Sequence, residues 1–178
     1  MSVANMLLES NTIKALATWQ PIEEVSPREV VATLELRFAQ AFGPEQVHIA
    51  QLENSESGLS SYDLYFVTPV ERRFGNTEGV AIYLSSFIRV AALGMMSGYF
   101  SPQGCSYAGI RPEDVATSSE HDALLLRTSI NAVRESNYHL LTKDEALSRL
   151  PSGVVPYEYC FGPEPWDRVF HVLYSNTD

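Results

Sequence analysis

The residues of this 178-residue chain best able to do chemistry are four histidines and two cysteines. The histidines are His48, His121, His139 and His171, and the cysteines are Cys105 and Cys160. Metal sites that can be read from a sequence place their ligands a few positions apart, as in H-x-x-x-H or C-x-x-C, and the chain contains neither spacing. We therefore expect no metal and no cofactor.

A glycine-rich segment around one cysteine, residues 104–109 (GCSYAG), suggests a nucleophile but lacks the G-x-S-x-G pattern of a nucleophile elbow. Catalytic groups can also converge from distant positions. One enzymatic alternative therefore stays open, a small enzyme whose site is assembled from Cys105, His121 and Asp63. The simpler interpretation is a turn at 104–109 and two reduced structural thiols, with a single disulfide as the alternative.

The charge of the chain favours a protein as its partner. The 22 acidic and 12 basic side chains give a net charge of −10, and each half of the sequence carries −5. A surface of this sign repels nucleic acid and anionic lipid and attracts basic proteins. We therefore expect no nucleic-acid or membrane partner, but a basic toxin or effector domain, with a homodimer as an open alternative.

The segment 155–167 (VPYEYCFGPEPWD) is the strongest candidate for contact with such a partner. Its three prolines limit the conformations of a loop, and its aromatic and acidic side chains are residue types that anchor and steer protein interfaces. The predicted partner-binding residues are Tyr157, Glu158, Tyr159, Glu164, Trp166 and Asp167. In the alternative interpretation, the aromatic rings cover the edge of the core.

The pattern of apolar residues predicts a single α+β domain over residues 1–178, with helices packed on one face of a mostly antiparallel sheet. We expect one or two short helices in 3–18, helices over 27–42 and 119–136, a short helix from the capping box at 142–145, and strands over 46–53, 62–68 and 168–174. The core should contain Leu34, Phe38, Leu126 and Ile130.

Local signals set the expected ends of these elements. Ser26 with Glu29, and Thr142 with Glu145, have the spacing of capping boxes, and Gly43 should end the helix over 27–42. A turn region is expected over Pro69–Gly79, which holds Gly75-Asn76, and residues 101–118 are expected to be irregular.

Residues 80–100 are apolar over a length that could span a bilayer. Arg89 near the centre makes insertion unfavourable, and the apolar residues alternate. One strand, or two strands joined by a bend, fits this pattern better than a membrane helix. The N-terminal residues also lack the basic and apolar regions of a signal peptide, so we expect a cytoplasmic protein.

Three passages together resemble the small immunity and antitoxin-type proteins of bacterial toxin–immunity pairs. They are AIYLSSFIRVAALGMM at 81–96, the strand and capped helix of Tyr138–Leu147, and the C-terminal VFHVLYSNTD at 169–178. The resemblance is one of layout and covers about half of the chain. It implies a protein without catalytic residues that binds a cognate toxin and blocks its active site. The main alternative is an acidic secretion chaperone, a class that is usually homodimeric and holds an unfolded segment of an effector.

Overall fold

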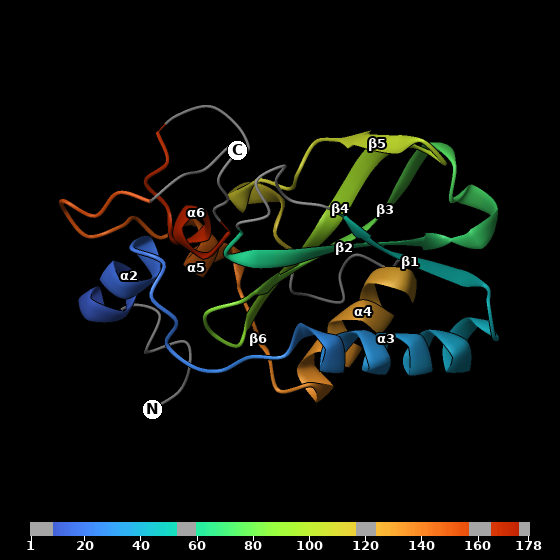
Figure 1. Ribbon diagram of the computed structural model, residues 1–178, viewed down its shortest axis with the longest axis horizontal. Coiled ribbons are helices and arrows are strands. Elements are labelled where there is room, and N and C mark those ends of the chain that lie inside the picture. Colours follow the sequence, from blue (N-terminus) through green and yellow to red (C-terminus); the bar gives the residue numbers. More distant parts are fainter. Residues whose placement is uncertain (1–8, 53–59, 117–123, 157–164, 175–178) are drawn as a thin grey trace.

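The computed structural model of this protein describes residues 9–52, 60–116, 124–156 and 165–174, which are arranged around one sheet (Figure 1). The helices are α2 (Ser10–Ala17), α3 (Pro27–Phe42), α4 (Leu124–Glu135), α5 (Lys143–Leu147) and α6 (Val169–Leu173), with the 3-10 helices η1 (Val70–Arg72) and η2 (Pro112–Asp114). The strands are β1 (Val47–Leu52), β2 (Tyr62–Pro69), β3 (Gly75–Ser85), β4 (Val90–Ser101), β5 (Gly104–Tyr107) and β6 (His139–Leu140).

The sheet is an antiparallel meander in the order β1-β2-β3-β4-β5, and the short strand β6 joins β4 in parallel. Its longest pair is the β3–β4 hairpin, whose register runs from Leu84 opposite Ala91 to Gly75 opposite Phe100. The expectation of two strands joined by a bend over residues 80–100 is therefore confirmed. Within the described part of the chain, no helix is both long enough and apolar enough to cross a membrane.

Side chains alternate between the two faces of the sheet, and helices cover part of each face. On one face, α3 and α4 lie side by side beneath the strands (Figure 1), and the four predicted core residues are all buried there. These buried residues are Leu34, Phe38, Leu126 and Ile130. The α+β class and the shared face of the two long helices are thus confirmed. The short helices α2 and α6 pack on the opposite face of the sheet, around Tyr62, Tyr83 and Tyr174.

The long helix α3 begins and ends where the sequence predicts. Pro27 occupies the first turn, where its missing N–H breaks no hydrogen bond, and Gly43 follows the last turn with a φ of 95° that favours glycine. Ser26 lies at the N-cap, but its side chain makes no capping hydrogen bond, so the predicted capping box with Glu29 is absent.

Two further local predictions were wrong, and one was only partly right. Residues 168–174, predicted as a strand, contain helix α6; every residue from Val169 to Leu173 is buried, and an apolar run without periodicity cannot separate a buried strand from a buried helix. The turn region predicted over 69–79 holds η1 in its first half, but Gly75 to Gly79 belong to β3. The stretch 101–118, predicted as irregular, holds the short strand β5. Residues 119–123 of the predicted second long helix lie outside the described residues.

Candidate functional site

The structure describes two of the six predicted partner-binding residues, and both contact the protein itself. Trp166 is half-buried and packs against the core on the α2–α6 face of the sheet. The Asp167 carboxylate lies 3.1 Å from Nε of Arg168 and 3.8 Å from Nε of Arg149. Its backbone carbonyl accepts a hydrogen bond from the Leu150 N–H at 2.9 Å.

The other four predicted residues, Tyr157, Glu158, Tyr159 and Glu164, lie outside the described residues. The contacts of Trp166 and Asp167 fit the alternative interpretation, in which this segment covers the edge of the core. Contact between the segment and a partner stays a prediction.

Two of the three residues of the enzymatic alternative, Asp63 and Cys105, lie far apart in the structure. Through the pairing of β2 with β3 and of β3 with β4, Asp63 lies level with Ala91 on β4. Cys105 on β5 pairs with Phe100, which lies nine positions further along β4 than Ala91. At about 3.3 Å per residue this separates the two by about 30 Å. The thiol of Cys105 is exposed on β5, and His121 lies outside the described residues. Asp63 and Cys105 therefore cannot share one catalytic centre.

A group of polar side chains that the sequence analysis missed lies where β2 begins, on the face covered by α3. Burial raises the pKa of the Asp63 carboxyl, although a hydrogen bond from Gln51 Nε2 at 3.1 Å opposes this shift. Burial, reinforced by the Asp63 charge, raises the pKa of Tyr65 to about 12, and burial likewise raises that of Tyr138 to about 12. Both phenols are therefore protonated at physiological pH and can act as hydrogen-bond donors.

Beside this group, the chain before α3 is fastened to the bend between β3 and β4. Glu23 Oε1 accepts a hydrogen bond from the Arg89 N–H at 2.6 Å, and the Glu23 carboxylate also lies 3.9 Å from Arg89 Nε. The N–H groups of Ile22 and Glu23 both donate to the Phe87 carbonyl. The sequence marks Arg89 as an isolated charge within an apolar stretch, but no local pattern in it indicates Glu23 as the partner.

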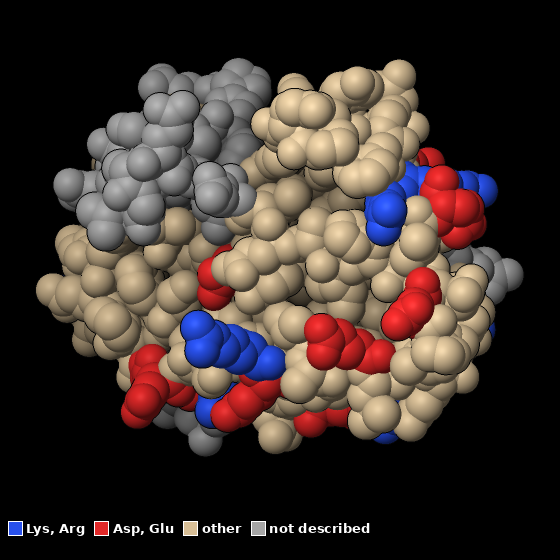
Figure 2. Space-filling model, turned by 45° about the vertical axis from the view of Figure 1, so that its right-hand side comes forward, with Lys and Arg blue, Asp and Glu red and all other residues tan. Residues whose placement is uncertain are grey.

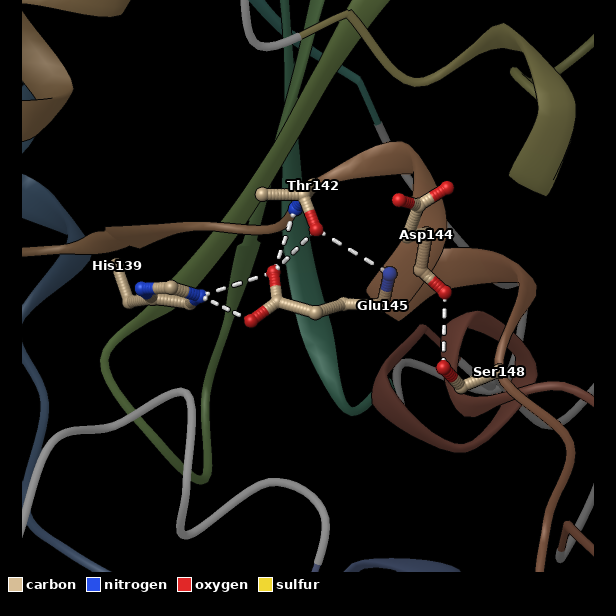
Figure 3. Close-up of polar contacts among 5 residues, drawn as sticks. All are labelled: His139, Thr142, Asp144, Glu145 and Ser148. Atoms are coloured by element: carbon tan, nitrogen blue, oxygen red, sulfur yellow. Dashed lines mark hydrogen bonds and ion pairs between the residues drawn. The ribbon is translucent and has the colours of Figure 1, made fainter.

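The most extensively hydrogen-bonded carboxylate among the described residues belongs to Glu145, in the first turn of α5 (Figure 3). It accepts from the N–H of Thr142 at 2.7 Å and from the Thr142 hydroxyl at 2.8 Å, and His139 Nε2 lies 3.0 and 3.1 Å from its two oxygens. Thr142 Oγ1 in turn accepts from the Glu145 N–H at 3.2 Å. The capping box predicted at 142–145 is confirmed. It fastens α5 to strand β6, which carries His139.

These contacts set the protonation of Glu145. Burial alone would raise the pKa of its carboxyl, but the hydrogen bonds from Thr142 and His139 outweigh burial and hold the pKa below its ordinary value. The carboxylate is therefore ionised at physiological pH and serves as an anchor of local structure.

His171 in α6 also has a structural role. Burial lowers the pKa of its imidazole to about 4, so the ring is neutral at physiological pH. Its Nδ1 accepts a hydrogen bond from the Arg168 N–H at 3.2 Å, which caps the first turn of the helix.

The described residues include a set of exposed acidic side chains that form no ion pair and are therefore available to attract a basic partner. Eight carboxylates are exposed and make no ion pair with the described residues, which include every Lys and Arg of the chain. They belong to Glu9, Glu24, Glu29, Glu35, Glu45, Glu71, Glu78 and Asp144. Figure 2 shows acidic side chains scattered over the lower part and the upper right of one face, several of them beside basic side chains, without one dense patch.

The net charge is also unevenly shared along the chain. The described residues hold 15 of the 22 acidic and all 12 basic side chains, a net charge of −3. The remaining −7 belongs to the stretches 53–59, 117–123, 157–164 and 175–178. The two halves of the sequence carry equal charge, but the acidic excess is concentrated in these short stretches.

Among the described residues, no three His, Cys, Asp or Glu side chains are grouped so that they could hold a metal ion. Comparison with known proteins found no matching family model, no matching curated protein and no matching solved structure.

Proposed function

We propose that this chain is a non-enzymatic binding protein that neutralises a cognate toxin by direct contact with a basic toxin domain. The observation that carries the proposal is the set of eight exposed carboxylates without ion pairs, on a chain of net charge −10. Unpaired charge accelerates the encounter with an oppositely charged protein and disfavours like-charged partners. The proposed place of action is the cytoplasm, where an immunity-type protein protects the cell that makes its own toxin.

The distribution of the carboxylates indicates how they would act. Glu29 and Glu35 lie on α3, whereas Glu45, Glu71 and Glu78 lie near the distant end of the sheet. Charges spread in this way steer a partner during approach more than they hold it afterwards. Lasting contact would need apolar anchors, and the segment with Trp166 is proposed to supply them.

A growth assay tests the proposal. The probe is the C-terminal domain of a large secreted protein encoded beside the gene for this chain, expressed with and without this protein. We expect the domain to stop growth alone and the coproduced chain to restore growth, with a one-to-one complex on native mass measurement. Death of the coproducing cells, with both proteins present and folded, would refute the proposal. Binding to an unfolded segment outside the toxic domain, without protection, would identify a secretion chaperone instead.

Charge variants test the steering separately. The double variant Glu29→Gln/Glu35→Gln should slow association, flatten its salt dependence and leave the dissociation rate nearly unchanged. Lys14→Gln, at an exposed position, changes the net charge in the opposite direction and should speed association. Equal association rates in both variants would show that charge does not steer this complex.

A further inference from the structure

One part of the sheet presents an exposed face that the helices do not cover. On the α3–α4 side, buried residues extend along β3 only to Val80 and along β4 only to Leu93. Beyond this point the same side of the sheet is exposed. We call this surface the β4 face; its exposed residues are Asn76, Glu78, Met95, Ser97, Tyr99 and Ser106.

Two of the six residues of the β4 face, Tyr99 and Met95, are of types that are enriched in interface cores. Tyr99 is 54% and Met95 36% exposed, and tyrosine and methionine are enriched at the centres of protein interfaces, where charged residues are depleted. Glu78 is the single charged side chain of the face. The strands beneath it are firmly packed, because on their opposite side the ring of Phe100 stacks on Phe66 with centroids 4.5 Å apart.

Burial alone does not account for the absence of charged residues in the part of the sequence that forms β4 and β5. The sequence from Val90 to Ile110 contains no Lys, Arg, Asp or Glu over 21 residues, although the chain as a whole carries −10. Burial explains this for residues 90–94, which are covered on both faces. It does not explain the exposed positions Met95, Ser97, Tyr99 and Ser106. In Figure 2 the tan atoms at the upper middle, where Figure 1 places β5, include no charged side chain, although acidic and basic side chains lie beside them at the upper right.

We infer that the β4 face is a self-association surface, on which a second copy of this chain docks through the same face. Charge selects this occupant. A basic partner is drawn to the eight unpaired carboxylates, seven of which lie off the β4 face, whereas two copies that each carry −10 repel one another and can approach best where charge is sparse. A two-fold dimer needs only one patch that can meet its own copy, and the β4 face offers exposed Tyr and Met side chains with a single charge, that of Glu78.

The proposal makes a directional prediction about salt. Salt screens the repulsion between two acidic copies, so the dimer should become tighter between about 0.05 and 0.5 M NaCl. Capture of a basic toxin by charge steering should weaken over the same range. Dimer formation and toxin binding can therefore be confirmed or refuted independently, because salt should change their affinities in opposite directions.

Sedimentation equilibrium of the full chain is the test. We expect a species of twice the 19.8 kDa monomer mass that becomes more abundant with protein concentration and with salt. Tyr99→Glu places two added charges in the interface and should raise the dimer dissociation constant at least about tenfold. Glu78→Gln removes like charges from it and should lower that constant. Glu35→Gln on α3 is the matched control, since it changes the net charge equally but lies off the β4 face.

Near-ultraviolet circular dichroism checks that each variant is folded. A single 19.8 kDa species at every concentration and salt would overturn the proposal. A dimer that a folded Tyr99→Glu variant leaves unchanged would overturn it as well, by placing the interface elsewhere. If the wild-type chain stays monomeric and Tyr99→Glu abolishes protection against the toxic domain, the face binds that partner and not a second copy.

Discussion

Replacing Glu145 by alanine removes the carboxylate that joins β6 to α5, and the structure allows the cost to be worked out. Three hydrogen-bond donors lose their acceptor, namely the N–H and hydroxyl of Thr142 and the Nε2–H of His139. Losing half of a capping box costs about 1 kcal/mol, and losing a hydrogen bond to a charged group about 1.5–3 kcal/mol. Because the contacts share one carboxylate, they do not add fully. We expect a loss of about 2–3 kcal/mol in the free energy of unfolding.

Two neighbouring variants sharpen this expectation. Glu145→Gln keeps one oxygen that can accept from the Thr142 N–H, so it should lose only about 1 kcal/mol. Asp144→Ala is the matched control, because Asp144 lies in the same helical turn but is exposed and makes no ion pair with the described residues. It should lose less than about 1 kcal/mol, the scale of an acidic side chain near a helix N-terminus.

Thermal melts across a pH series provide the assay. In a chain of this size 1 kcal/mol corresponds to about 2–4 °C in Tm, so Glu145→Ala should melt about 5–10 °C below wild type at pH 7. Because the pKa of Glu145 is lowered in the folded state, its contribution is complete above the ordinary value of 4.5 and is lost as the pH falls through the folded-state value. Equal losses in the variants at 144 and 145, or a Tm gap that stays constant into acid, would refute this reasoning.

Three further substitutions test the core, the buried charge and the C-terminal segment. Phe38→Ala should cost about 3–5 kcal/mol in chemical denaturation, because the ring is 3% exposed among α3, α4 and the sheet; a loss below about 1 kcal/mol would mean that its packing is misassigned. Asp63→Asn should raise Tm by roughly 2 °C at pH 7, because burial raises the pKa of Asp63 and its ionisation therefore opposes folding. The gain in Tm should disappear in acid, where Asp63 is protonated in both states, and a Tm difference of the opposite sign would contradict this assignment. Trp166→Ala should lower stability by about 2 kcal/mol, less than for a fully buried ring, and should raise the dissociation rate of a toxin complex only if the segment is also an anchor. Full affinity in the folded Trp166→Ala fraction would leave Trp166 a purely structural role.

The elements that the sequence predicts well are those whose signals are local and periodic. Helix α3 has proline at its start, glycine at its end and an apolar stripe between them, and each signal acts within one turn. The β3–β4 hairpin could be expected only in part, because the alternation of apolar residues over 80–90 indicates strand but fits one strand as well as two strands joined by a bend. Helix α6 could not, because all five of its residues are buried and its sequence shows no period.

The candidate site depends on contacts that sequence separation hides. The sequence alone allows Asp63 and Cys105 to lie in one site. The pairing of β2 with β3, of β3 with β4 and of β4 with β5 shows that they lie at opposite ends of the sheet. The link between Glu23 and Arg89 joins positions 66 residues apart, and no local pattern indicates such a pairing. The contact of Glu145 with Thr142 was predictable because it spans three residues, whereas its contact with His139 depends on how β6 meets α5.

The two proposed interactions place opposite demands on charge, and seven of the eight carboxylates proposed to steer a basic partner lie off the β4 face. Steering of a basic partner requires carboxylates that no internal cation neutralises, such as Glu29 and Glu35 on α3. Self-association requires a surface where an acidic chain can meet its own copy, and the β4 face has one charged residue, Glu78. If the surfaces are separate, a dimer would bind two toxin domains, and toxin affinity would not depend on the concentration of this chain. If the two surfaces overlap, the dimer that forms at a higher concentration of this chain would compete with toxin binding. This competition would be strongest at high salt, where screening favours the dimer and weakens steering.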